Sequence, residues 1–385
     1  MNLYLYHNLF NDPVLKAVLS NDISLAQQLL FDFAENEAVS STIFREYLIR
    51  QILEDENTFS NACSNQKCGG TLSDFARRDI GNIFETLNVT VFPDYERNQQ
   101  NTPPFYDYEQ SLKNLLETTD IEAFFKLLTL HYTRFGCGKL SKFTAFRYRG
   151  ALTGIKEFTA PSLDDLVGLE YQKQTLIANT KAFVDGKNAN NVILFGDSGC
   201  GKSSSVKALL TMFQNSGLRL IEYSKEYISQ LPELFTALRS RPYRYIIFLD
   251  DLSFENNDAN YKNLKIAMEG QLEQQSSNVL IYATSNRRHL LTEYWADRMG
   301  DEVHINDTKQ EKLSLSERFG IRIVFASPSQ DEYLKIVAEL LKKENIELTP
   351  EIQKQAILWE MSYNGRSGRT AKQFVTHLTA QMGGG

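Results

Sequence analysis

The chain has 385 residues, more than one hydrophobic core usually serves, so two or three domains are expected. Hydrophobic residues make up 42% and charged residues 23% of the sequence, which excludes a fibrous or a wholly disordered chain. The 41 basic and 48 acidic residues give a net charge of −7, and this balance argues against a globally basic nucleic-acid-binding protein.

The N-terminal part of the chain predicts helices. Apolar residues recur at spacings of three and four from Ile43 to Ile52, and strand patterns are scarce before residue 130. A polar, proline-containing stretch at 93–104 predicts an exposed loop. We therefore expect an N-terminal all-α domain over residues 1–157.

Neither a targeting signal nor a metal-binding cysteine pattern is present. The first ten residues lack a basic region followed by an apolar one, and no apolar stretch approaches the ~20 residues that span a bilayer. Cys63, Cys68, Cys137 and Cys200 lack the paired spacing of zinc sites and are interpreted as buried thiols. The sequence thus predicts a cytoplasmic protein without a membrane span.

After residue 157 apolar, strand-like runs alternate with helical segments, a pattern typical of a parallel α/β sheet. Five strands are predicted, at 191–195, 218–223, 245–249, 279–283 and 321–325. Three helical segments follow, the first opening at Ser329 and the second with Thr349 as N-cap before Pro350. We expect an α/β core over 158–326 and a small helical domain over 327–385.

The strongest motif is a phosphate-binding loop. Glycine, four residues, glycine, lysine and a hydroxyl follow a predicted strand and open a predicted helix, which is the context that the motif requires. Backbone N–H groups and the helix N-terminus would hold phosphate oxygens, with Lys202 on the β- and γ-phosphates and the Ser203 hydroxyl on Mg²⁺. The expected binding residues are Gly196, Asp197, Ser198, Gly199, Cys200, Gly201, Lys202, Ser203 and Ser204.

Two carboxylates end the strand predicted at 245–249. In a sheet with a phosphate-binding loop this end lies beside the phosphates, so Asp250 is expected to hold Mg²⁺. Asp251 would then act as general base on the attacking water. The alternative is that both are solvated turn residues, which are common at strand ends.

These segments, together with Ala283-Thr284-Ser285-Asn286-Arg287-Arg288-His289 and Ser316-Glu317-Arg318-Phe319-Gly320, resemble successive motifs of AAA+ ATPases. The resemblance extends over about 158–381 and is nearest to an uncharacterised bacterial AAA+ family described only as ATP-binding. It implies ATP and Mg²⁺ as cofactors, hydrolysis of ATP, a homo-oligomer, and remodelling of an unknown macromolecular target.

The resemblance also implies roles for single residues. Asn286 matches sensor 1, which orients the attacking water, and Arg318 matches the arginine finger, which acts in trans on a neighbouring subunit's nucleotide. Arg369 is similar to sensor 2 on the helical lid, with Arg366 as the competing candidate. Val167 and Gly168 match the segment beside the adenine.

One departure from the family pattern concerns turnover. AAA+ proteins usually have Asp-Glu at the acidic strand end, whereas Asp251 is one methylene shorter, so hydrolysis could be slow or Glu255 could contribute. A nucleotide-gated binding module with little turnover therefore stays open, as does a P-loop kinase. GTP is disfavoured, because the nearest guanine-reading string, at 308–311, ends in Glu311.

Two other segments have less specific patterns. The run from Lys139 to Arg149 interleaves basic and aromatic residues, which leaves nucleic acid open as a partner, but a linker that packs on its neighbour is favoured. The segment 293–312 is either a substrate-facing loop or a simple surface excursion, and the surface excursion is favoured. His289 and His304 form no cluster with cysteine, so no metal other than Mg²⁺ is expected.

Overall fold

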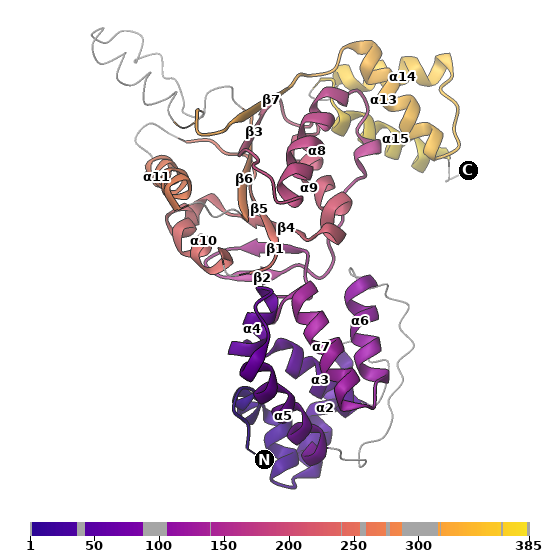
Figure 1. Ribbon diagram of the computed structural model, residues 1–385. Coiled ribbons are helices and arrows are strands. Elements are labelled where there is room, and N and C mark those ends of the chain that lie inside the picture. Colours follow the sequence, from indigo (N-terminus) through magenta and orange to yellow (C-terminus); the bar gives the residue numbers. More distant parts are fainter. Residues whose placement is uncertain are drawn as a thin grey trace. The chain divides into compact units, whose positions relative to one another are not determined.

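The computed structural model describes residues 2–36, 43–87, 106–138, 140–239, 241–254, 259–274, 278–286, 315, 317–362 and 365–382. The chain forms two compact units (Figure 1). The N-terminal unit comprises Met1–Phe143 with Ser240–Pro242, and the C-terminal unit comprises Thr144–Arg239 with Tyr243–Gly385. Across the described ranges, no helix is both long enough and apolar enough to traverse a bilayer.

The N-terminal unit is helical throughout its described part, as predicted. Its elements are η1 (His7–Asn11), α1 (Pro13–Leu19), α2 (Ile23–Asn36), α3 (Ile43–Glu54), α4 (Thr58–Ser64), α5 (Gly70–Leu87), α6 (Tyr106–Glu117) and α7 (Ile121–Phe135). The apolar spacing in α3 buries Ile49 and Ile52 completely, and Phe59 of α4 stacks on Phe125 of α7 with ring centroids 5.4 Å apart. This core is built from helix faces alone.

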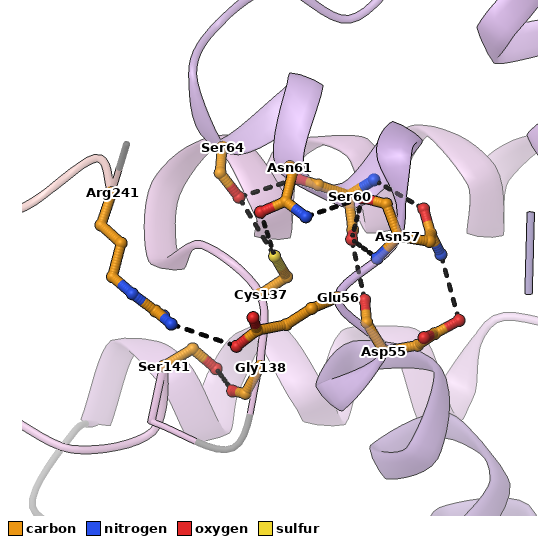
Figure 2. Close-up of polar contacts among 10 residues, drawn as sticks. All are labelled: Asp55, Glu56, Asn57, Ser60, Asn61, Ser64, Cys137, Gly138, Ser141 and Arg241. Carbon is orange, nitrogen blue, oxygen red and sulfur yellow. Dashed lines mark hydrogen bonds and ion pairs between the residues drawn. The ribbon is translucent and has the colours of Figure 1, made fainter. Parts of the chain in front are cut away.

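A polar network surrounds α4 in the same unit (Figure 2). Asn57 caps the helix by accepting the N–H of Ser60 at 2.9 Å, while the Ser60 hydroxyl accepts the N–H of Asn57 at 2.9 Å. Arg241, from the segment between α10 and β5, donates to Glu56 at 3.2 Å. Burial raises the pKa of the Cys137 thiol, as expected for an unreactive cysteine.

The C-terminal unit contains a seven-stranded sheet in the order β2-β1-β4-β5-β6-β3-β7. All neighbouring strands are parallel except β1 and β2. The strands are β1 (Ala145–Tyr148), β2 (Leu152–Gly154), β3 (Val192–Gly196), β4 (Leu218–Tyr223), β5 (Arg244–Leu249), β6 (Val279–Ser285) and β7 (Ile321–Phe325). The five predicted strands are β3 to β7, so the predicted fold class is confirmed.

The prediction of only five strands is wrong, because the short strands β1 and β2 extend the sheet beyond β4. Both fall within the segment that the sequence placed in the N-terminal domain. In β1 the basic and aromatic residues alternate between the two faces, so that Phe146 and Tyr148 are buried and Arg147 is exposed. This alternation was not recognised as a strand from the sequence. Arg147 pairs with Glu222 of β4 at 3.2 Å, and this cross-strand ion pair supports the pairing of β1 with β4.

Helices cover both faces of the sheet (Figure 1). One face carries α8 (Glu170–Val184) and α9 (Lys202–Phe213), and the other carries α10 (Leu231–Arg239) and α11 (Ala259–Gln274). Short helices η2 (Leu163–Asp165), η3 (Gln214–Ser216) and η4 (Lys225–Gln230) lie in the connections. Strands β3, β5 and β6 are buried along almost their whole length, as expected for the centre of a parallel sheet.

Three helices follow β7 and share a hydrophobic core of their own, and we call them the lid. They are α13 (Gln330–Lys343), α14 (Pro350–Ser362) and α15 (Gly368–Met382). Helix α13 begins with a capping box between Ser329 and Glu332, and α14 begins at Pro350, both as predicted. The partition at 326/327 stays a proposal, because β7 and the lid belong to one compact unit.

Candidate functional site

The loop between β3 and α9 requires glycine at three places. Gly196, Gly199 and Gly201 have φ of 152°, 82° and 92°, values that glycine adopts without strain. A Cβ on Gly196 would lie 2.0 Å from the carbonyl oxygen of Phe325, so the loop begins in backbone contact with β7. Helix α9 begins at Lys202, and its N-terminal N–H groups face the loop.

Lys202, the first residue of α9, contacts the loop through its side chain. Its ammonium donates to the carbonyl oxygens of Gly196 and Asp197 at 2.6 and 2.7 Å and to Oδ1 of Asn286 at 2.9 Å. Burial lowers the pKa of this lysine, and neighbouring acidic groups, among them Asp197 and Asp250, oppose the shift. The chain thus brings a desolvated cation to the end of β3.

Asp250, at the end of β5, lies beside the start of α9. Its Oδ1 accepts hydrogen bonds from the hydroxyls of Ser203 and Thr284, each at 2.6 Å. The register explains the meeting, because β6 lies between β5 and β3 and pairs with both. Thr284 was not selected from the sequence. Its position two residues before Asn286 could have indicated it, because residues two apart in an extended segment have side chains on the same side.

Asp251 faces Asn286. The Nδ2 group of Asn286 donates to Oδ1 of Asp251 at 2.7 Å, and the N–H of Asp251 donates to the Thr284 hydroxyl at 2.9 Å. The contacts among loop, β5 and β6 therefore close a ring of hydrogen bonds. Its members are Lys202, Ser203, Asp250, Asp251, Thr284 and Asn286.

The lid touches the phosphate loop directly. Arg369 of α15 makes a long hydrogen bond of 3.4 Å with Ser198, and a Cβ on Gly199 would lie 2.9 Å from the hydroxyl oxygen of Ser367. The competing sensor-2 candidate, Arg366, is paired instead with Glu360 at 3.0 Å. Of the two arginines, Arg369 is the one that contacts the loop.

The connection from β7 to the lid also contacts the loop. The Ser327 hydroxyl donates to Oδ2 of Asp197 at 2.6 Å and lies 3.9 Å from the sulfur of Cys200. Cys200 is buried between loop and sheet, as predicted for a small hydrophobic residue. The sequence did not indicate Ser327, because no short motif surrounds it.

Other predicted site residues lie apart from the ring. The guanidinium of Arg318 forms an ion pair with Glu269 of α11, whose side chain is half-buried. Gly168, with φ of 76°, is followed by Leu169, whose Cδ1 would lie 3.1 Å from a Cβ on Gly201. The hydrophobic segment that contains Val167 thus lies along the phosphate loop.

Several residues named from the sequence lie outside the described ranges. They are the predicted loop 93–104, Lys139, Glu255, Arg287, Arg288, His289, His304, Ser316 and the segment 293–312. Within the described part of the chain, no three His, Cys, Asp or Glu side chains gather as metal ligands.

The donor set fits a magnesium nucleotide. Ser203 and Asp250 place two hard oxygen ligands 2.6 Å apart, and Mg²⁺ prefers to combine few such ligands with phosphate oxygens. The positive-φ glycines turn the backbone around the N-terminus of a helix of 12 residues, where anions bind. Lys202 places an ammonium group at the same loop.

The parallel sheet, the phosphate loop between β3 and α9, the acidic end of β5 and the helical lid define a P-loop α/β protein of the AAA+ class. The chain belongs to the family described as "Protein of unknown function (DUF815)", whose model matches residues 141–382. No curated protein matches the chain.

Several solved structures align with part of the chain. The Holliday junction branch migration motor RuvB of Thermotoga maritima is 16% identical over 58% of this chain and 74% of its own, with a TM-score of 0.36. The ORC1 protein of Aeropyrum pernix, solved in complex with DNA, is 16% identical over 56% and 61%, with a TM-score of 0.41.

AMPPCP-bound DnaA from Aquifex aeolicus is 18% identical over 58% of this chain and 66% of its own, with a TM-score of 0.39. The alignments with ORC1 and DnaA thus span less than two thirds of those chains. Values this low carry no information about activity.

Proposed function

We propose that the C-terminal unit binds ATP with Mg²⁺ and hydrolyses it to ADP and phosphate, and that the protein couples this hydrolysis to remodelling of a macromolecular target. The observation that supports the proposal is the ring of hydrogen bonds from Lys202 through Asn286, Asp251, Thr284 and Asp250 to Ser203. It gathers a cation, two hydroxyls, an amide and two carboxylates at the phosphate loop.

Each group has a role that its chemistry allows. Lys202 and the N-terminal N–H groups of α9 would hold the phosphates, and Ser203 with Asp250 would hold the metal. When bound, Mg²⁺·ATP supplies the phosphoanhydride to be cleaved and the metal charge that balances the phosphates. Asp251 would accept a proton from water, and Asn286, which contacts both Asp251 and Lys202, would orient that water.

Two further contacts support the rest of the expected site. Arg369 reaches the phosphate loop from the lid, which suits sensor 2. Arg318 is one third exposed beside α11, where a second subunit could meet it, so we propose a homo-oligomer in which Arg318 acts in trans. The target stays open, with nucleic acid not favoured.

The test is substitution of Lys202 by alanine in the full chain. The Kd for Mg²⁺·ATP is expected to rise by about tenfold or more, because the ammonium contributes a charge-assisted contact to the phosphates. Calorimetry measures the binding, and phosphate release measures the turnover. Lys187→Ala, which removes an exposed lysine of the same unit, should change neither. Unchanged ATP binding by Lys202→Ala would contradict the proposed site.

A second candidate is an ATP-gated binding module with little turnover. One observation favours it: the side chain of Asp251 is one methylene shorter than glutamate, and its carboxylate already accepts a hydrogen bond from Asn286. An assembled sample that binds ATP but releases no phosphate would support this second function.

A further inference from the structure

Thr284 contacts three consecutive residues at the acidic end of β5. Its hydroxyl donates to Oδ1 of Asp250 at 2.6 Å and accepts the N–H of Asp251 at 2.9 Å. Its carbonyl oxygen accepts the N–H of Leu252 at 2.7 Å. Thr284 is 1% exposed and lies in β6, an interior strand of the sheet, so these three contacts are made in the buried part of the unit.

The backbone at Asp251 is unusual. Its φ of 53° is in the left-handed region, which side chains other than glycine rarely adopt and which asparagine and aspartate tolerate best. An aspartate at this position is therefore compatible with its backbone conformation. A residue in this conformation persists only when its surroundings hold it, and the Thr284 hydroxyl and carbonyl accept the N–H groups of Asp251 and Leu252.

The left-handed residue lets both carboxylates reach one site. In a continuing strand, successive side chains point to opposite faces. Here Asp250 contacts Ser203 of α9, while Asp251 contacts Asn286, which in turn contacts Lys202. The strand alternation therefore ends at Asp250, and Thr284 lies at that point.

We propose that Thr284 is a positioning residue that sets both carboxylates, Asp250 for the metal and Asp251 for the water. It acts through them and touches neither nucleotide nor metal. The inference rests on the proposed ATPase function and deepens it.

The test compares three substitutions of Thr284 in the full chain. Thr284→Val keeps the size and removes the hydroxyl, Thr284→Ser keeps the hydroxyl, and Thr284→Cys provides a weaker donor of similar size. For Thr284→Val, kcat is expected to fall by about 10- to 100-fold while the Kd for ATP stays within about threefold. The Mg²⁺ concentration for half-maximal rate should rise, Thr284→Ser should restore kcat to within about threefold, and Thr284→Cys should be intermediate.

Thr180→Val is the matched control. Thr180 is also fully buried in the C-terminal unit. Its hydroxyl contacts the Tyr282 hydroxyl at 2.8 Å, and Tyr282 is not a member of the hydrogen-bond ring at the site. Thr180→Val should cost a comparable amount of stability and leave kcat and the Mg²⁺ requirement unchanged. If Thr284→Val does not fold, the order of kcat among wild type, Thr284→Ser and Thr284→Cys decides.

Two results would overturn the inference. One is a folded Thr284→Val with wild-type kcat and Mg²⁺ requirement, and the other is an equal loss of kcat in Thr180→Val. Both presuppose a wild type that binds Mg²⁺·ATP, and if it binds without turnover, the Mg²⁺ requirement of binding replaces kcat. If the wild type does not bind Mg²⁺·ATP, the proposed function is refuted and this inference with it. Measuring the wild type first distinguishes that outcome from a failure of the inference alone.

Discussion

Within the N-terminal unit, the imidazole of His131 is completely buried, and its Nδ1 lies 3.0 Å from the hydroxyl oxygen of Ser111. Tyr108 and Phe135 cover the ring, with centroids 4.9 and 5.0 Å away. Among the described residues its Nε2 finds no hydrogen-bond partner. Burial lowers the pKa of His131 to about 3, so the folded unit holds a neutral imidazole.

This burial predicts acid sensitivity. The unfolded chain protonates His131 near its ordinary pKa of 6.5 and the folded chain only near pH 3. The contribution of His131 to the free energy of unfolding is therefore constant above pH 6.5 and falls as the pH drops from 6.5 toward 3. Between pH 7 and pH 5 this one group should reduce the free energy of unfolding by about 2 kcal/mol. Hydrogen exchange of α7 amides measures it. His131→Phe should lose that part of the pH dependence, and His7→Gln, an exposed control, should keep it.

Two elements meet at Gly199, the phosphate loop and helix α15 of the lid. A Cβ there would lie 2.9 Å from the hydroxyl oxygen of Ser367 and 3.1 Å from Cβ of Arg369. Ser367 is itself held by Thr370, whose hydroxyl lies 2.9 Å away. The close approach of loop and lid therefore depends on the missing side chain at Gly199.

Gly199→Ala is expected to destabilise the C-terminal unit by about 2–4 kcal/mol. One part of the cost is the positive φ, and the other is the steric clash of the new Cβ with Ser367 and Arg369. Gly217→Ala has the same backbone cost, because φ is 87° at Gly217 and 82° at Gly199. Its Cβ, however, would meet only Tyr243, at 4.0 Å. The difference between the two variants in thermal unfolding measures the contact between loop and lid. Equal losses would show that this contact adds nothing.

At the scale of the whole molecule, the strands and the site residues were predicted to different extents. The strands β3 to β7 followed from their apolar runs, because a buried parallel strand is hydrophobic along its length. The short β1 and β2 did not, since their alternation extends over few residues and pairing with β4 decides it. Thr284 was missed because its partner Asp250 is 34 residues away.

Assembly also belongs to this scale, and Arg318 provides the test. If it acts in trans, Arg318→Ala should bind ATP normally and lose turnover by a factor of about 10³ or more. Mixing it with inactive Lys202→Ala subunits should restore part of the activity, because each variant supplies what the other lacks. Arg322→Ala, an exposed arginine of β7, should retain full activity. Full activity of Arg318→Ala, with phosphate release and light scattering measured on one sample, would exclude the trans role.

Local sequence was enough to predict the glycine-rich loop from Gly196 to Ser203, the carboxylates at the end of β5 and the helix starts at Ser329 and Pro350. These depend on neighbours within a few residues, and backbone conformation and local hydrogen bonding decide them. The left-handed conformation of Asp251, the contacts of Thr284 with the Asp250 carboxylate and the Asp251 N–H, and the contact of Gly199 with the lid depend on the folded structure. Each joins segments distant in the chain, and strand register and helix packing set such meetings.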